Sequence, residues 1–360
     1  MKKLRIGFLS TAGIGRKNWK AIYNSGNAIV SAVASRDVDK SLEFIDECQQ
    51  QFPFAARPLA LGSYAELLAS PEVDAVYIPL PTGLRQEWVL RAAKAGKHVI
   101  CEKPCAVDSA GLEKMISACK KYRVQFMDGV MFMHNPRLPE AGKYLRDGNS
   151  LGEVRRISSA FTFYGGGNFV RENIRADGAL EPAGCLGDLG WYSIRFTLWA
   201  MDWKMPRAAT GKIHSQSPAK DGRVPAPLEF SGELIYDGGV SAGFYCSFRA
   251  ASQQWVTVGG TKGCLHMPDF VHPFNSREPS FQINRREICV KTPGAKKSAP
   301  VADAMEFGHA TAQDTRMWRN FARQVSSGTL NRDWPVWALK TQQVLDTCLE
   351  AARRGTVVQL

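Results

Sequence analysis

The sequence predicts an α/β domain built on a parallel sheet, followed by an α+β domain with a large open, mostly antiparallel sheet. In the first third of the chain, short apolar strands alternate with amphipathic helical segments, a pattern typical of a parallel sheet covered by helices on both faces. After about residue 130, glycine-rich segments of alternating polarity replace it, which indicates antiparallel strands. A chain of 360 residues also exceeds the usual size of a single core.

We place the boundary between the two domains at residue 125, so that they cover 1–125 and 126–360. The strands expected in the first domain are the apolar runs at 4–10, 28–35, 73–80, 97–103 and 124–130, with helices at 84–96 and 109–122 among the segments between them. In the second domain we expect one helical patch at 186–201 and two closing helices at 310–326 and 335–353. These closing helices are candidates to pack back on the first domain.

Composition excludes several classes of protein. The nine cysteines form no C-x-x-C pair, which favours reduced thiols in a cytoplasmic protein and gives no metal-binding spacing. The strand-like run close to Met1 leaves no room for a signal peptide, and no apolar run is long enough to span a membrane. The net charge of +12 is scattered except for a cluster at 285–297. We therefore expect neither a nucleic-acid nor a membrane partner, and a surface that attracts an anionic cofactor.

The first strand runs into a degenerate dinucleotide-binding fingerprint. That fingerprint needs small residues spaced as G-x-G-x-x-G for a tight turn, close approach to a pyrophosphate and helix packing. Ser10, Ala12 and Gly15 occupy the three positions, and Gly13 lies between them. The backbone of the following helix would hold the phosphates. The cofactor-binding residues predicted here are Ser10, Thr11, Ala12, Gly13, Ile14 and Gly15.

The end of the second strand predicts which dinucleotide binds. Ser35 and Arg36 stand where an NAD enzyme places a carboxylate that binds the ribose. An arginine there would pair with a 2′-phosphate, and a serine would donate a hydrogen bond to it. Asp37 follows one residue after the position of that carboxylate, and we expect its side chain to point away from the ribose. The segment therefore favours NADP over NAD, and the alternative is an ordinary surface turn.

Two further strands end in proline-containing segments. Leu80, Pro81 and Thr82 close one of them, and Glu102-Lys103-Pro104 closes the next. Because ligands of such folds bind at the carboxyl ends of the strands, Leu80, Pro81, Thr82, Glu102 and Lys103 join the predicted cofactor site. Taken alone, each segment is only a strand exit.

In this order, the segments resemble the glucose–fructose oxidoreductase/inositol dehydrogenase (Gfo/Idh/MocA) family over essentially the whole chain. Glu102-Lys103-Pro104 matches its E-K-P motif, 127–136 its hinge segment, 184–195 the helix with its D-x-x-x-[H/Y] pair, and 259–263 a turn of its large sheet. The resemblance implies a Rossmann domain, with Lys103 beside the nicotinamide and Tyr192, four residues after Asp188, as the acid/base. A tyrosine there resembles the branch of glucose–fructose oxidoreductase, dimeric dihydrodiol dehydrogenase and NADP-dependent xylose dehydrogenase.

The sequence departs from the family's pattern in two places. Arg85 stands where the family often has histidine, and Met133 where an arginine is common. The arm that wraps the dinucleotide in the cofactor-retaining branch has no counterpart before the first strand, which leads us to expect an exchangeable cofactor. The resemblance also implies a homodimer or homotetramer formed through the second sheet.

The proton chemistry is predicted to involve a lysine and a tyrosine. A free tyrosine has a pKa of about 10, and we expect the Lys103 ammonium to lower that of Tyr192 and make it a proton relay. Asp188 would orient the pair. His134 and Arg195 are candidate substrate contacts, and Arg195 is also a candidate anchor for Asp188. For each of these side chains the alternative is simple packing or helix capping.

We therefore predict an NADP(H)-dependent oxidoreductase that acts on a CH–OH or C=O group of a sugar, a sugar derivative or a cyclic diol. The alternative is a non-catalytic NADP(H)-binding sensor or partner protein.

Overall fold

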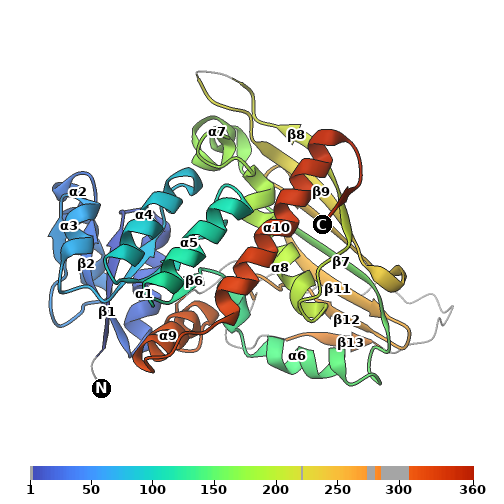
Figure 1. Ribbon diagram of the computed structural model, residues 1–360, viewed down its shortest axis with the longest axis horizontal. Coiled ribbons are helices and arrows are strands. Elements are labelled where there is room, and N and C mark those ends of the chain that lie inside the picture. Colours follow the sequence, from blue (N-terminus) through green and yellow to red (C-terminus); the bar gives the residue numbers. More distant parts are fainter. Residues whose placement is uncertain (1–2, 220–221, 274–279, 285–307) are drawn as a thin grey trace, which may run out of the picture.

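The computed structural model describes residues 3–219, 222–273, 280–284 and 308–360. Two sheets make up the protein: a six-stranded sheet near the N-terminus and an eight-stranded sheet in the second half of the chain. They lie side by side in Figure 1, and the long helix α10 (Asp333–Arg354) runs along the large sheet toward the first one. The predicted fold class is confirmed.

The six-stranded sheet is parallel throughout, with the order β3-β2-β1-β4-β5-β6. Its strands are β1 (Leu4–Leu9), β2 (Ala28–Ala34), β3 (Leu59–Leu61), β4 (Ala75–Ile78), β5 (His98–Cys101) and β6 (Phe126–Asp128). The order reverses direction between β1 and β4, and a crevice at the carboxyl ends of the strands is where such sheets bind dinucleotides. β6 begins directly after residue 125, and a domain boundary there stays a prediction.

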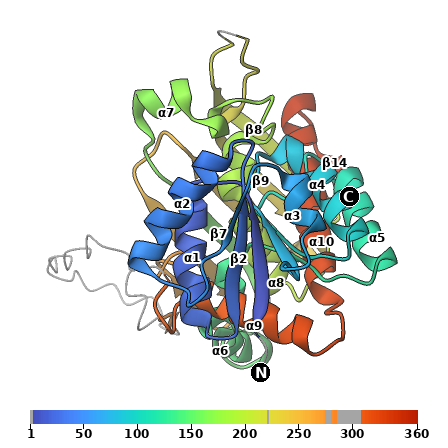
Figure 2. The same ribbon diagram turned by 90° about the vertical axis from the view of Figure 1, so that its left-hand side faces the viewer.

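Helices cover both faces of this sheet. Figure 2 shows α1 and α2 on one side of the strands and α3, α4 and α5 on the other. Their bounds are α1 (Ile14–Ser25), α2 (Val38–Gln51), α3 (Tyr64–Ala69), α4 (Thr82–Lys94) and α5 (Ser109–Lys121). Asp37, Ser63 and Asp108 cap α2, α3 and α5 by accepting backbone N–H groups. Asp37 is therefore engaged in this cap, and its orientation relative to a cofactor stays a prediction.

The eight-stranded sheet has the order β13-β12-β11-β7-β10-β9-β8-β14, and only β7 and β10 pair in parallel among its described strands. Its strands are β7 (Val154–Thr162), β8 (Ala208–Gln216), β9 (Pro227–Ile235), β10 (Ser241–Ser247), β11 (Gln253–Gly260), β12 (Cys264–Met267), β13 (Gln282–Asn284) and β14 (Val358–Gln359). Burial alternates along β9 and β10, so one face is covered and the other is more open.

Shorter elements precede the large sheet or lie between its strands. They are the 3₁₀ turns η1 (Met131–His134), η2 (Ile174–Ala176) and η4 (Asp237–Gly239), the π-helical turn η3 (Leu186–Gly190), and the helices α6 (Arg137–Arg146), α7 (Gly166–Glu172) and α8 (Trp191–Ala200). The turn η3 and α8 form the helical patch predicted at 186–201. α8 is buried on nearly all sides, which explains its continuous apolar sequence.

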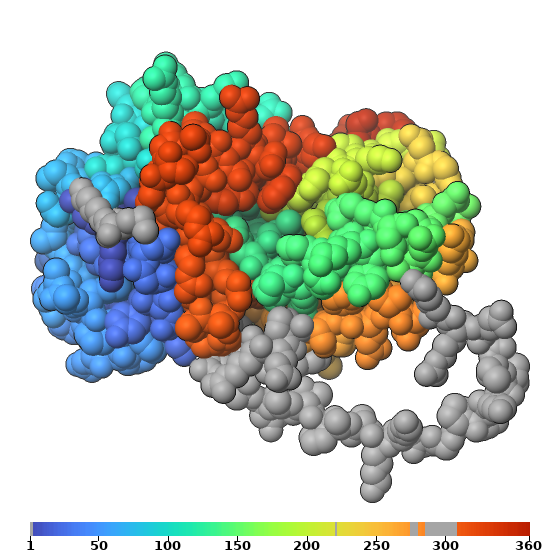
Figure 3. Space-filling model, turned by 90° about the horizontal axis from the view of Figure 1, so that it is seen from below, coloured from blue at the N-terminus to red at the C-terminus, as the bar shows by residue number. Residues whose placement is uncertain are grey.

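The two C-terminal helices contact both halves of the molecule. α9 (Gln313–Ser326) packs against α1 and η1, where Trp318 Nε1 donates to Asn18 Oδ1 over 2.7 Å. α10 packs against α5, α8 and β8, and Asp346 accepts the backbone N–H of Ser109 at 2.6 Å. Figure 3 shows these orange-red helices lying across the blue and green parts of the protein.

The eight described cysteines are free thiols, and seven of them are buried. In the described part of the chain, no helix combines the length and the apolar character that crossing a membrane requires. The basic cluster at 285–297 lies outside the described residues.

Candidate functional site

A cavity of about 600 Å³ lies between the carboxyl ends of the parallel strands and the large sheet. Both halves of the chain line it. The first half contributes Ala12, Gly13, Ile14, Lys17, Asn18, Pro79, Leu80, Arg85, Glu102, Lys103 and Pro104. The chain from residue 129 onward contributes, among others, Met131, Phe161, Phe163, Ile174, Arg175, Glu181, Asp188, Tyr192, Gln254 and His272. The cavity therefore joins the predicted cofactor segments to the predicted acid/base helix.

The degenerate fingerprint forms a tight turn before α1. Ser10 adopts φ = 133°, and its Oγ accepts the backbone N–H of Ala12 at 3.3 Å. A Cβ on Gly13 would meet nothing within 4 Å, whereas one on Gly15 would lie 2.9 Å from Phe44 Cζ. Gly13 thus leaves open space for a ligand, and Gly15 lets α1 pack closely. This turn fits the phosphates of a dinucleotide.

The residues after β2 place an arginine side chain on the surface. Ser35 is buried at the end of the strand, and its N–H donates to Leu61 O at 3.2 Å. Arg36 follows it on the surface. Neither residue lines the cavity described above, so their contact with a 2′-phosphate stays a prediction.

The segment after β4 is held by the second half of the chain. Thr82 donates its backbone N–H to Glu181 Oε1 at 3.1 Å and its hydroxyl to Oε2 at 2.5 Å. Leu80 lines the cavity, whereas Pro81 and Thr82 do not. Thr82 is therefore a contact between the domains in this structure, and its binding to a cofactor stays a prediction.

Lys103 lies at the centre of the site. Its Nζ donates to Asp188 Oδ1 at 2.5 Å and to the Asp188 carbonyl oxygen at 2.7 Å. The second carboxylate oxygen of Asp188 faces Arg175 Nε at 3.0 Å. Burial alone would raise the pKa of Asp188, but the charges of Lys103 and Arg175 outweigh it and hold that pKa well below the usual value. Asp188 is therefore ionised at neutral pH.

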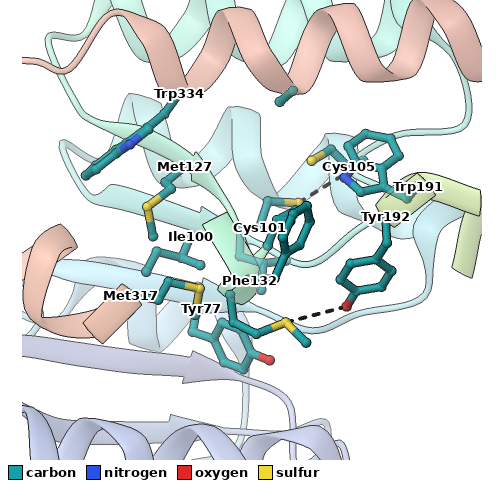
Figure 4. Close-up of a cluster of buried hydrophobic side chains, with 14 of the residues drawn as sticks. Tyr77, Ile100, Cys101, Cys105, Met127, Phe132, Trp191, Tyr192, Met317 and Trp334 are labelled. Carbon is teal, nitrogen blue, oxygen red and sulfur yellow. Dashed lines mark hydrogen bonds between the residues drawn. The ribbon is translucent and has the colours of Figure 1, made fainter. Parts of the chain in front are cut away.

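Tyr192 lies under the lysine ammonium but is not hydrogen-bonded to it. Lys103 Nζ is 4.9 Å from the centre of the phenol ring, and the hydroxyl donates to Met131 Sδ at 3.7 Å. Figure 4 shows the hydroxyl pointing toward this sulfur. The π-helical turn η3 lies between Asp188 and α8, and both side chains line the same cavity.

The expected direction of the Tyr192 pKa is wrong. Burial raises the pKa of this phenol well above its ordinary value, and the carboxylates of Glu102 and Asp188 raise it further. Lys103 pairs with Asp188, so its charge does not act on the phenol alone. Tyr192 is therefore a protonated phenol at neutral pH.

Glu102 is fixed from behind the site by a chain of hydrogen bonds. Tyr77 donates its hydroxyl to Glu102 Oε1 at 2.6 Å, and Asn18 Nδ2 donates to that hydroxyl oxygen at 2.8 Å. Asn18 in turn accepts from Trp318 of α9. This chain connects the fingerprint helix, the E-K-P segment and the C-terminal helix, so it orients the residue that precedes Lys103.

The two candidate substrate contacts do not line the cavity. His134 packs against Trp334 with ring centres 6.1 Å apart, and its Nδ1 is 3.1 Å from Asn320 Nδ2. Arg195 is buried and pairs with Asp128 at 2.5 Å, so it does not anchor Asp188. Both side chains point toward the C-terminal helices, because η1 packs against α9 and α8 packs against α10.

Several cavity residues were not identified from the sequence. Arg175 belongs to a short 3₁₀ turn without any periodic pattern, and His272 lies in an irregular segment after β12. Lys17 could have been identified from the sequence, because it lies in the first turn of α1, directly after the fingerprint. Among the described residues, no group of three or more His, Cys, Asp or Glu side chains has a metal-binding arrangement.

Comparisons with known proteins match both parts of the chain. Residues 4–130 match the oxidoreductase family with an NAD-binding Rossmann fold, and residues 141–266 match the GFO/IDH/MocA C-terminal domain. The chain is 30% identical to an uncharacterized oxidoreductase of Rhizobium meliloti, over 99% of this chain and 98% of the relative. It is 29% identical to D-xylose 1-dehydrogenase (NADP+) 2 of Haloferax volcanii, over 99% and 100%.

One solved structure resembles the whole chain. The 3-ketoreductase from Actinomadura kijaniata in complex with NADP and TDP-benzene superposes with a TM-score of 0.79 and 25% identity. The match covers 97% of this chain and 98% of that one. The similarity therefore includes both sheets.

Proposed function

The chain belongs to the Gfo/Idh/MocA family of oxidoreductases, and from that premise we propose that it transfers hydride between NADP(H) and a CH–OH or C=O group of a sugar, a sugar derivative or a cyclic diol. Named relatives support both parts, since one is an NADP-dependent xylose dehydrogenase and another a 3-ketoreductase complexed with NADP. The observation that carries the proposal is the position of Lys103, which contacts Asp188 and Tyr192 in the cavity that the fingerprint also lines.

The residues that would hold the cofactor lie at the carboxyl ends of the strands. The turn at Ser10 to Gly15 would bind the pyrophosphate, and Arg36 would bind the 2′-phosphate. Leu80 and Glu102 line the path from there to Lys103. When bound, the nicotinamide ring supplies or accepts the hydride.

Proton transfer is assigned to Tyr192. A phenol that stays protonated at neutral pH donates a proton to the oxygen of a carbonyl substrate and takes it back in the reverse reaction. The Lys103 ammonium polarises the same oxygen and stabilises the phenolate that forms. Asp188 keeps the ammonium over the ring by binding it through two oxygens.

A panel of aldoses, polyols and cyclic diols, followed by nicotinamide absorbance, tests the proposal. We expect turnover with at least one class, and its loss in Lys103→Met. Lys114→Met, at an exposed position of α5, is the matched control and should keep turnover. Tight NADPH binding without turnover across the panel would instead favour a dinucleotide-binding sensor.

We also propose that the open face of the large sheet joins subunits into a homodimer or homotetramer. A shallow hollow on this face is lined by polar and aromatic side chains, including Arg156, Lys212, Glu233, Tyr245 and Trp255. Reversing the charge at Arg156, which pairs with Glu233, is expected to yield monomers in analytical ultracentrifugation. An unchanged mass would contradict this interface.

We also propose that the protein is located in the cytoplasm. The eight described cysteines are free thiols, and seven are buried, which fits a reducing compartment. Cell fractionation with an antibody against the protein tests it, and recovery in an extracellular fraction would contradict it.

A further inference from the structure

Arg175 presents part of its guanidinium to the cavity. Its side chain is 43% exposed, and the residue lines the cavity beside Ile174 and Phe163. Its Nε lies 3.0 Å from Oδ2 of Asp188. Within the described parts of the chain, neither terminal nitrogen of Arg175 donates a hydrogen bond. A guanidinium can bind an anion through Nε and one terminal nitrogen or through its two terminal nitrogens. In Arg175 the two terminal nitrogens are the pair that could bind an anion.

The neighbouring carboxylates are already engaged. Asp188 shares its charge between Arg175 and Lys103. Glu181 accepts two hydrogen bonds from Thr82, and Arg85 lies 4.0 Å from it. Glu102 accepts the Tyr77 hydroxyl. Asp188 is therefore the carboxylate that pairs with Arg175, and it shares its charge with Lys103.

The surroundings of Arg175 suit a part of the substrate that lies away from the reacting oxygen. Phe161 and Phe163 form an apolar wall, and Tyr192 lies against Phe161 with ring centres 5.5 Å apart. The ion pair with Asp188 holds the guanidinium in place before any ligand binds. A fixed, partly desolvated guanidinium whose terminal nitrogens donate no hydrogen bond to the described residues suits the bidentate binding of an anion.

On the basis of the proposed function, we propose that Arg175 binds a carboxylate or phosphate group of the substrate, at the side of the site away from the fingerprint. The substrate class is then an anionic sugar or polyol, such as a sugar acid or a sugar phosphate. Lys103 and Tyr192 act on the reacting oxygen, and Arg175 determines specificity.

Calorimetric titration of the NADP+-saturated protein tests this site. The probes are D-glucuronate, D-glucose 6-phosphate and neutral D-glucose. We expect at least one anionic probe to bind at least tenfold more tightly than D-glucose, and the ratio between the two anions tells carboxylate from phosphate. Arg175→Gln should abolish this preference and leave the affinity for D-glucose unchanged, whereas Arg175→Lys should keep part of it.

Arg171→Gln is the matched control, because Arg171 is exposed on the neighbouring α7 and does not line the cavity. It should keep the full preference. Equal weakening of neutral and anionic probes in Arg175→Gln would overturn the proposal and leave Arg175 only a positioning role toward Asp188. A wild-type protein without any preference for the anionic probes would overturn it as well.

Titration with NADP+ alone separates this proposal from the proposed function. Absence of cofactor binding would contradict the proposed function itself. Cofactor binding without a preference for anionic sugars would contradict only the anion site at Arg175.

Discussion

The ammonium nitrogen of Lys103 lies 4.9 Å from the centre of the Tyr192 ring while both the carbonyl and the carboxylate of Asp188 bind it. The lysine is therefore fixed over the ring and not at the hydroxyl. A charge in this position attracts the face of the phenol, and it reaches a substrate oxygen only if that oxygen lies beside the ring. The substrate is thus expected to bind with its reacting oxygen between the ammonium and the hydroxyl.

Replacing Arg36 should change the preference between the two dinucleotides. An exposed arginine after β2 would form charge-assisted hydrogen bonds with the 2′-phosphate, each contributing about 1.5–3 kcal/mol. Arg36→Ala is expected to weaken NADPH binding by about 10- to 100-fold and to leave NADH binding nearly unchanged. Fluorescence titration with both cofactors measures this, and equal losses for the two would refute the assignment.

His134 should make stability depend on pH. Burial, with a smaller effect of the Arg195 charge, lowers its pKa to about 4, compared with about 6.5 in an unfolded chain. Between these values the unfolded chain binds more protons, so stability is lost as pH falls below about 6.5.

We expect the free energy of unfolding to drop by about 2 kcal/mol more in the wild type than in His134→Asn between pH 7 and pH 5. Urea unfolding at the two pH values measures the difference. Parallel losses in both proteins would show that His134 does not titrate in this way.

The fold was predictable because the strands and their ends carry strong local signals. The apolar runs at β1, β2, β4 and β5 and the glycine turn between β11 and β12 identified both sheets. The short β3 was missed because Leu59–Leu61 is only partly buried and lacks a long apolar run.

The site was predictable only where a residue follows a strand or belongs to a helix with a motif. Lys103, Asp188 and Tyr192 do, and they meet in one cavity. Arg175 does not, since its position depends on the path of an irregular segment. The Tyr192 pKa also depends on the burial of the phenol and on the pairing of Lys103 with Asp188. Neither can be predicted from the sequence.

The buried pair of Arg195 and Asp128 is expected to stabilise the protein and not to bind substrate. Both side chains are nearly inaccessible to solvent, and Arg195 Nε also donates to Thr341 of α10 at 2.7 Å. Arg195→Met leaves the Asp128 charge buried and should lower the free energy of unfolding by about 3–5 kcal/mol.

The double variant with Asp128→Asn should recover part of that loss in urea unfolding. NADPH affinity should stay at the wild-type level in folded protein. A stable Arg195→Met protein with weakened substrate binding would restore Arg195 as a substrate contact.

The most direct test of the account is the Tyr192→Phe variant, assayed with NADPH and a substrate that the wild type turns over. We expect unchanged NADPH affinity and a fall in kcat of about 100- to 10,000-fold, because the phenylalanine fills the same space but cannot donate a proton. A variant that binds NADPH normally and retains the wild-type kcat would contradict the assignment of Tyr192 as the proton donor.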